Sequence, residues 1–185
     1  MLSSICYITG RYGALETGLG EYLATLADEV FGVSLSRELM AESPLDQVAV
    51  VARALDRAEA QRAPVIANSY GAYLTLQAMI GRGTLRTRVL LLSPVLGRTV
   101  TSTRISIPPL AKRLERALEV GECEADWLEM HIGDGDEGLD EERFSKVAVV
   151  TSCDRAEIHR DEGHSFRKRT LASIVDRFIA INLDR

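Results

Sequence analysis

The segment PVIANSYGAYLTLQAM, residues 64–79, carries the pattern on which the fold prediction depends. An apolar, β-branched run that ends at Asn68 favours a strand, and the residues from Tyr70 to about Ile80 favour a helix. Ser69 stands at the junction between small residues, where a strand that passes directly into a helix needs a tight turn. The segment therefore predicts a strand, a turn at Ser69 and a helix.

The same alternation of strand-like and helix-like segments continues along the chain. Short apolar or β-branched runs predict strands at residues 4–9, 30–35, 64–68, 89–93, 127–132 and 156–160. Apolar residues at helical spacing predict helices within residues 19–30, 43–55, 70–80, 110–118 and 171–179. Because parallel neighbours are joined by long crossovers, this order predicts a three-layer, doubly wound α/β fold. We expect a mostly parallel sheet of about six strands with helices on both faces.

Length and composition are those of a folded domain. The chain has 185 residues, of which 46% are hydrophobic, and no apolar block approaches 18 residues. We expect one domain, residues 1–185, with a sizeable core and no membrane span. Residues 97–121 fit either a short cap over a cleft or an ordinary packing helix. The N-terminal sequence lacks a signal-peptide pattern, so we expect a cytoplasmic location.

Charge and cysteine content narrow the classes of partner. The formal net charge of -5 argues against nucleic-acid binding, because such proteins need excess Lys and Arg to neutralise phosphates. Cys6, Cys123 and Cys153 are an odd number without metal-ligand spacing, so we expect reduced thiols rather than disulfides or a zinc site. The acidic run 137–142 has no histidine arranged with it, which favours a solvated helix start over a metal site.

The residues that follow the predicted strands are the candidates for function, because open parallel sheets bind ligands at the carboxyl ends of their strands. In chain order, the strands deliver Thr9–Gly13, Ser69, Gly133–Asp136 and Gly163–Ser165 to this edge. These segments contain a serine, then an aspartate, then a histidine. Together they have the parts of a nucleophilic triad.

Three of these segments resemble motifs of one family. ANSYG, residues 67–71, resembles the small-x-Ser-x-small nucleophile elbow of the α/β-hydrolase family, with Ala67 where glycine is commoner. Gly133–Asp136 is similar to the Gly-x-x-Asp pattern of that family, and DEGHSF, residues 161–166, to its Gly-His loop before the last helix. The resemblance covers nearly the whole chain. It implies a compact, bacterial-type serine hydrolase that acts on a small-molecule acyl substrate without metal or organic cofactor.

The resemblance also implies a role for each residue. Ser69 is expected to attack the acyl carbon, and His164 to take the serine proton and return it to the leaving group. Asp136 is expected to orient the imidazole and to stabilise its charged form. The backbone N–H groups of Tyr70 and Arg11 are expected to form the oxyanion hole.

Two other carboxylates remain open as the acid of this site. Asp134 lies two residues before Asp136 in the same glycine-rich loop. Asp154 would serve instead if residues 146–152 (KVAVVTS) formed the strand that precedes the acid. Asp136 is preferred because it fits the Gly-x-x-Asp pattern.

The serine and the histidine also have purely structural interpretations. Ser69 could be a turn residue that caps the next helix, which suits an isolated Ser-x-Gly but does not account for its partners at other strand ends. His164 could be a surface loop residue. Among the other histidines, His131 lies within a predicted strand and His159 just before the acidic loop, so His164 is the best placed of the three.

These residues support three classes of function. The preferred hypothesis is a hydrolase of a carboxylic ester or a related acyl bond, and thioesterases, peptidases and acyltransferases share the same parts. A second is a binding protein that keeps the fold without catalysis, since fold does not fix function. A third, a nucleotide-binding oxidoreductase, is suggested by the glycines of Thr9–Gly13. Their spacing misses G-x-G-x-x-G, and Ser34–Ser36 offers no acidic residue for a ribose.

Overall fold

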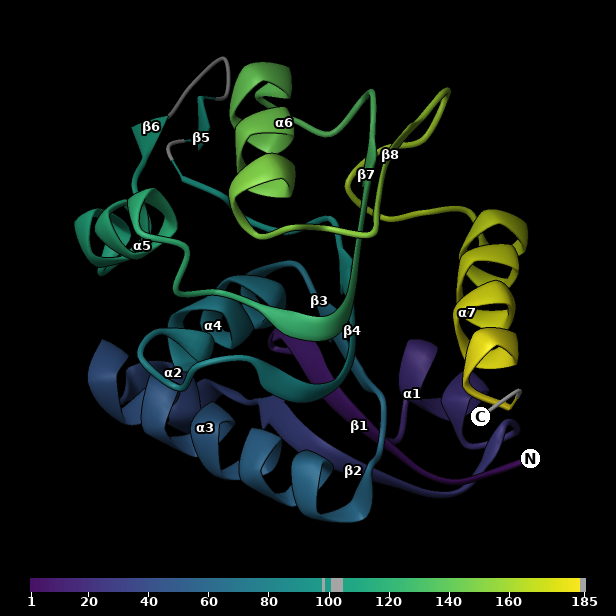
Figure 1. Cartoon of the computed structure of the whole chain (residues 1–185). Coiled ribbons are helices and arrows are strands. Elements are labelled where there is room, and N and C mark those ends of the chain that lie inside the picture. The colour runs from purple at the N-terminus through teal and green to yellow at the C-terminus, as the bar shows by residue number, and fades with distance from the viewer. Residues whose placement is uncertain (98, 101–104, 184–185) are drawn as a thin grey trace.

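A computed structural model describes residues 1–97, 99–100 and 105–183 (Figure 1). Its elements are, in chain order, β1 (Leu2–Arg11), α1 (Leu19–Leu23), β2 (Ala27–Leu35), α2 (Arg37–Ala41), α3 (Pro44–Gln61), β3 (Val65–Asn68), α4 (Tyr70–Met79), β4 (Leu85–Leu92), β5 (Thr99–Val100), β6 (Ile105–Ser106), α5 (Ala111–Glu119), β7 (Ala125–Gly133), α6 (Glu141–Val150), β8 (Arg155–His159) and α7 (Lys168–Leu183). Strands and helices alternate, as the sequence predicted.

The central sheet has six strands in the order β2-β1-β3-β4-β7-β8, and all of its neighbouring strands are parallel. This confirms the predicted mostly parallel sheet of about six strands. β5 and β6 form a separate antiparallel pair. In the register of the four central strands, Ile8 lies beside Ala67, Ala67 beside Leu91, and Leu91 beside Met130. The carboxyl ends of these strands therefore meet along one edge of the sheet.

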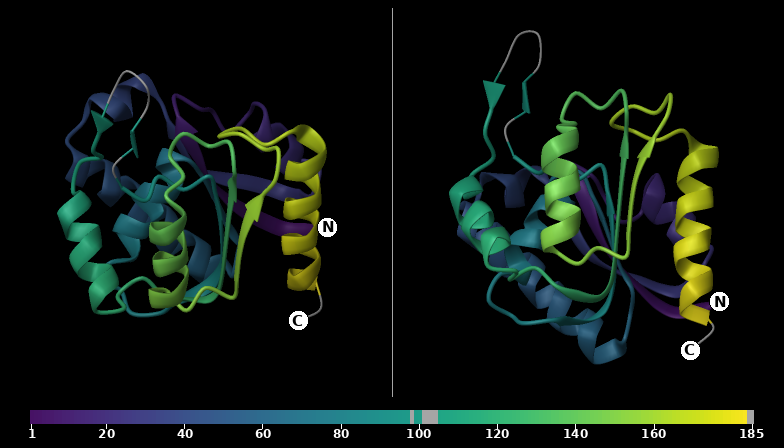
Figure 2. Two further views of the ribbon diagram at one scale, coloured as in Figure 1. Left: turned by 90° about the horizontal axis from the view of Figure 1, so that it is seen from above. Right: turned by 45° about the horizontal axis from the view of Figure 1, so that its top comes forward.

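Helices cover both faces of the sheet, which gives the predicted three layers (Figure 2). α1 and α7 cover one face, where Ile66 of β3 and Phe178 of α7 belong to the same apolar core. α3, α4, α5 and α6 cover the other face, where Ala67 belongs to the second and larger apolar core. Val65 and Ala67 belong to the larger core and Ile66 to the smaller one, because successive side chains of a strand point to opposite faces. Every residue of α4 is buried, so the segment quoted at the outset forms the centre of the molecule.

One predicted segment differs in the structure, and one alternative segment is not a strand. The helix predicted within residues 19–30 is wrong beyond Leu23, because β2 begins at Ala27 and pairs with β1 along its length. Pairing with a neighbouring strand outweighs the helical spacing of the apolar residues there. Residues 146–152, considered as an alternative strand, form the end of α6 and the turn after it.

The start of α3 follows its local sequence. Ser43 is the N-cap, its Oγ accepts a hydrogen bond from the N–H of Asp46, and Pro44 occupies the first turn. The helix ends at Arg62, which adopts a left-handed conformation. This stretch was predicted from the same residues, because capping is a local interaction.

Residues 97–121, for which a short cap and an ordinary packing helix were both considered, contain a helix that contributes to the core. α5 packs Leu114, Ala117 and Leu118 into the larger core. Residues 98 and 101–104 of this segment lie outside the described residues. Within the described ranges, none of the helices combines the length and the apolar character that a membrane span needs.

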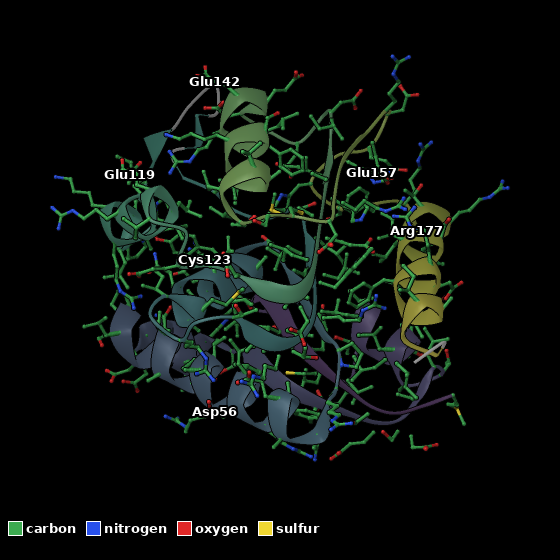
Figure 3. All side chains as sticks on the ribbon, viewed as in Figure 1. Asp56, Glu119, Cys123, Glu142, Glu157 and Arg177 are labelled. Carbon is green, nitrogen blue, oxygen red and sulfur yellow. The ribbon has the colours of Figure 1, made fainter. Side chains whose placement is uncertain are left out.

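The three cysteines are free thiols. Cys6 and Cys123 are fully buried, and Figure 3 shows Cys123 inside the molecule near α4. Burial raises the pKa of both thiols to about 12, because a thiolate loses its hydration there. The low thiolate fraction at neutral pH makes both side chains poor nucleophiles.

Gly71 lets α4 approach β1 closely. A Cβ atom on Gly71 would lie 2.2 Å from the carbonyl oxygen of Thr9 and 2.8 Å from that of Ile8. Both are backbone atoms of a central strand, so neither can move aside cheaply. The second small residue of the serine motif is therefore required by packing.

We expect Gly71→Ala to lower the free energy of unfolding by about 1–3 kcal/mol, as overpacking of a core does. This sign is opposite to the helix propensity, which favours alanine by up to about 1 kcal/mol. Urea unfolding measures the change. Gly163→Ala is the control, because a Cβ there meets no atom of the described residues within 4 Å, its two chain neighbours apart, and we expect a change within about 0.5 kcal/mol. A Gly71→Ala protein as stable as the native chain would contradict the packing argument.

Candidate active site

Ser69 forms the turn between β3 and α4. Its backbone has φ 54° and ψ -118°, a conformation that non-glycine residues rarely adopt. Its N–H donates to the carbonyl of Leu92 at the end of the neighbouring strand (2.8 Å). Among the described residues its Oγ makes no capping bond to α4, and it lies 2.8 Å from Nε2 of His164. The turn thus directs the hydroxyl to the histidine rather than to the helix.

His164 lies in the loop between β8 and α7 and joins Ser69 to Asp136. Its Nδ1 is 2.9 Å from Oδ2 of Asp136, whose side chain is only 4% exposed. The second carboxylate oxygen, Oδ1, accepts a hydrogen bond from the N–H of Gly138 (2.8 Å). Ser69, His164 and Asp136, which come from three loops, therefore form one continuous hydrogen-bonded chain.

The alternative acids lie elsewhere. Asp134 is exposed, and its N–H donates to the carbonyl of His159 (2.9 Å). Asp154 lies just before β8, at the opposite end of that strand from His159. Its carboxylate accepts a hydrogen bond from the N–H of Leu128 (2.8 Å). The carboxylate that reaches His164 is that of Asp136.

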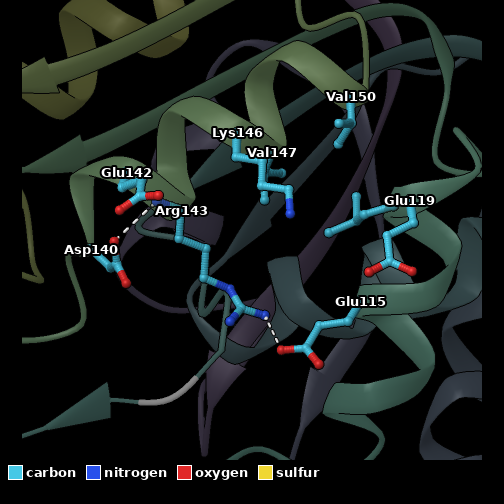
Figure 4. A pocket seen from close by; sticks show the side chains of 9 residues that line it. Glu115, Glu119, Asp140, Glu142, Arg143, Lys146, Val147 and Val150 are labelled. Atoms are coloured by element: carbon cyan, nitrogen blue, oxygen red, sulfur yellow. Dashed lines mark hydrogen bonds and ion pairs between the residues drawn. The ribbon is translucent and has the colours of Figure 1, made fainter.

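A cleft of about 510 Å³ opens over Ser69 and His164. Pro94, Val95, Ile107, Pro108 and Pro109 supply an apolar wall, and Arg11, Tyr70 and Glu137 add polar groups. Ile107, Pro108 and Pro109 belong to the segment 97–121, for which a cap was one of two interpretations. A second hollow, of about 330 Å³, lies between α5 and α6 and is lined largely by charged side chains, including the Arg143–Glu115 ion pair (Figure 4). Of these two hollows, the cleft over Ser69 combines reactive groups with an apolar wall.

The fold has close counterparts among solved structures. A monoacylglycerol lipase from Paleococcus ferrophilus superimposes with a TM-score of 0.67 at 13% identity, over 96% of this chain and 94% of that chain. Est1E from Butyrivibrio proteoclasticus gives 0.70 at 10% identity, over 100% and 89%. The carboxylesterase CesB from Bacillus subtilis gives 0.64 at 13% identity, over 96% and 84%. The chain has the α/β-hydrolase fold.

Comparison of sequences finds no match, in contrast to comparison of structures. No protein-family model matches the chain, and no curated protein sequence matches it. At 10–13% identity, the structural likeness shows the fold alone. What an α/β-hydrolase fold does in this chain is therefore argued from the geometry of its own residues.

Tyr70 and Arg11 flank Ser69 in this α/β-hydrolase fold. Tyr70 is the first residue of α4, where backbone N–H groups lack partners within the helix. Arg11 is the last residue of β1 and lines the same cleft. Its guanidinium carbon lies 4.7 Å from the centre of the Tyr70 ring, so the arginine side chain packs over the tyrosine. The two residues predicted to donate to an oxyanion are thus neighbours beside the serine.

Ser93 is hydrogen-bonded to the histidine loop, a contact that was not predicted from the sequence. It follows β4, has a φ of 45°, and its Oγ donates to the carbonyl of His164 (2.8 Å). Its N–H donates to the carbonyl of His131 (2.7 Å). The available signal was its position after the apolar run of β4, at the same sheet edge as Ser69.

Glu162, a member of the same loop, stabilises it through hydrogen bonds that were also not predicted from the sequence. Its buried carboxylate accepts hydrogen bonds from the N–H and Nε of Arg167 (2.8 and 2.9 Å) and from the hydroxyl of Thr170. These bonds, the one from Thr170 first, lower the pKa of Glu162 to about 2. The carbonyl of Glu162 accepts from the N–H of Gly135 (2.9 Å), which ties this loop to the loop of Asp136.

The pKa of His164 lies above its ordinary value of 6.5, because the imidazolium donates a hydrogen bond to Asp136 and is attracted by the charge of that carboxylate. Partial burial lowers the pKa, but by less than these two effects raise it. A raised histidine pKa stabilises the fold below the unfolded-state value. That contribution is lost as the pH rises through the folded-state pKa.

We expect Asp136→Asn to lower the pKa of His164, because the substitution removes the negative charge that favours the imidazolium. An NMR titration of the His164 ring measures this pKa directly. Asp134→Asn is the matched control, since it removes the same charge from an exposed site two residues away and should leave the His164 pKa nearly unchanged. If Asp134→Asn lowered the His164 pKa more than Asp136→Asn did, the assignment of Asp136 as the acid would be wrong.

Proposed function

We propose that this chain is a serine hydrolase that cleaves a carboxylic ester or a related acyl bond through an acyl-enzyme on Ser69. The observation that carries the proposal is the 2.8 Å contact between Ser69 Oγ and His164 Nε2, with Asp136 on the other side of the imidazole. A serine hydroxyl is a weak nucleophile near neutral pH and needs such a base. The cleft above Ser69 offers room for an acyl group.

Acylation begins when Ser69 Oγ attacks the acyl carbon while His164 Nε2 takes the hydroxyl proton. The carbonyl π electrons move onto oxygen, and the backbone N–H groups of Tyr70 and Arg11 are the proposed donors to that oxyanion. Asp136 stabilises the imidazolium that forms. The tetrahedral intermediate then collapses, the bond to the leaving alcohol breaks, and His164 donates its proton to that alcohol.

Deacylation repeats these steps with water. His164 takes a proton from a water molecule as the water oxygen attacks the acyl carbon, and the same N–H groups receive the second oxyanion. Collapse releases the carboxylic acid and returns the proton to Ser69 Oγ. Thioesters, amides and acyl transfer use the same intermediate, so the ester is the class we favour rather than a consequence of the triad.

The apolar wall supports an ester of a small molecule with an apolar acyl group as the substrate. Pro94, Val95 and Ile107 would contact such a group beside Ser69, and burial of apolar surface would supply binding energy. Two of the structural neighbours are named as a monoacylglycerol lipase and a carboxylesterase, which is in keeping with this class.

A fluorophosphonate probe tests the nucleophile. We expect one adduct per chain, mapped to Ser69 by peptide mass spectrometry, because only an activated serine reacts quickly with this electrophile. Ser69→Ala should abolish labelling, whereas Ser145→Ala, which removes an exposed hydroxyl on α6, should leave it unchanged. Labelling that persists in Ser69→Ala would refute the assignment, and absence of labelling in the native chain would favour a binding protein with this fold.

Hydrolysis of p-nitrophenyl esters of increasing chain length tests the acid and the acyl preference together. We expect Asp136→Asn to lower kcat by about 10⁴-fold, the size seen when a triad carboxylate is replaced by an amide. Asp134→Asn should change kcat by no more than a few-fold. Equal, slight effects of both substitutions would remove Asp136 from the proposed mechanism.

A further inference from the structure

A second cluster of reactive side chains lies between β7, β8 and α7, away from Ser69. His131 of β7 is fully buried and lies beside Glu157 of β8 in the parallel register. His159 follows two residues after Glu157, so the two side chains share a face of the strand. The cluster therefore consists of two imidazoles and one carboxylate on the face that α7 covers.

We propose that His131, Glu157 and His159 bind a divalent transition-metal ion of the zinc class. His131 Nδ1 lies 2.9 Å from His159 Nε2 and 3.4 Å from Glu157 Oε2, and His159 Nε2 lies 3.6 Å from the same oxygen. In a tetrahedral site with bonds of 2.0–2.1 Å, neighbouring ligand atoms are separated by about 3.3 Å. The three potential ligand atoms already have nearly this spacing.

The chemistry of these ligand atoms selects the class of ion. Imidazole nitrogen suits zinc, cobalt, nickel and copper, whereas magnesium and calcium prefer oxygen ligands throughout. Two histidines and one glutamate leave a fourth position for water, a combination that zinc accepts.

The outer nitrogen of His131 has the partner that metal-bound histidines usually have. Its Nε2 lies 3.2 Å from Oε2 of Glu129, which is fully buried on the same strand. The other carboxylate oxygen accepts a hydrogen bond from Nε1 of Trp127 (2.8 Å). A carboxylate on the outer nitrogen fixes the tautomer and leaves the inner nitrogen as the ligand.

Two arginines balance the carboxylates, and one oxygen of Glu157 faces both the histidines and Arg177. Arg155 Nη1 donates to Glu157 Oε1 (2.9 Å), so Oε2 faces the histidines. Arg177, from α7, lies 3.4 Å from that oxygen and 3.6 Å from Oε2 of Glu129. Figure 3 shows Glu157 and Arg177 in the same region between β8 and α7. The Arg177 side chain is one-third exposed, so its charge can be solvated when an ion takes its place.

The ion would stabilise the strand that leads into the histidine loop. β8 is the last strand of the sheet and pairs only with β7 among the described strands. The chain then runs from His159 through Glu162 to His164 within five residues. A metal bound to both strands would hold the start of this loop without taking part in the proposed reaction at Ser69.

Metal titration of chelator-treated protein tests the site without reference to activity. We expect Zn²⁺ to bind at one site per chain by calorimetry and to raise the Tm, since it binds the folded state. Co²⁺ should give the visible bands of a four-coordinate site without the intense near-ultraviolet band of thiolate ligation. Glu129→Gln should weaken binding by about 10–100-fold, as loss of an outer partner does.

His159→Ala and Glu157→Gln, which alter partly exposed side chains, should weaken binding more than Glu129→Gln does and remove the Zn²⁺-dependent rise in Tm. Circular dichroism confirms that each variant is folded. His164→Ala is the control for adventitious binding at the active-site imidazole and should keep the Zn²⁺ affinity. Equal affinities of the native and His159→Ala proteins, loss of binding in His164→Ala instead, or a thiolate band would each overturn the proposal.

Discussion

The backbone conformation of Ser69 is the constraint around which the rest of the molecule is arranged. A φ of 54° and a ψ of -118° at a non-glycine residue are unfavourable and persist only where neighbouring contacts enforce them. β3 lies between β1 and β4, the N–H of Ser69 is bound to Leu92, and α4 is buried along its whole length. Gly71 completes the arrangement, because its missing side chain lets the helix begin against Thr9.

The same sheet edge explains how three distant loops meet. Ser69, Asp136 and His164 follow β3, β7 and β8, and all of these strands run in one direction. Direction alone brings the loops to one edge but does not set distances of 2.8–2.9 Å. Those distances depend on the hydrogen bonds that fix the histidine loop. One runs from Ser93 to the carbonyl of His164, and others are made by the carboxylate of Glu162. The polar contacts around the site therefore complete what the topology begins.

The sequence predicted those features that depend on local interactions. The strand-turn-helix at Ser69 and the cap of α3 at Ser43 follow from residues close in the chain, and both are present. The order of the strands in the sheet and the true start of β2 depend on pairing between distant segments, which composition does not reveal. The choice among Asp134, Asp136 and Asp154 was open for the same reason, because only the three-dimensional structure brings one of them to His164.

Ser93 and the metal-binding candidates were missed because their contacts join residues far apart in sequence. Ser93 lies 71 residues from His164, and His131 lies 28 residues from His159. Each appears ordinary within its own strand or loop. The edge position of β8 also accounts for some of its charge, because polar residues on an edge strand discourage pairing with other chains. The buried imidazole of His131 needs a different explanation, since edge protection requires charge at the surface and not a histidine held between carboxylates under α7.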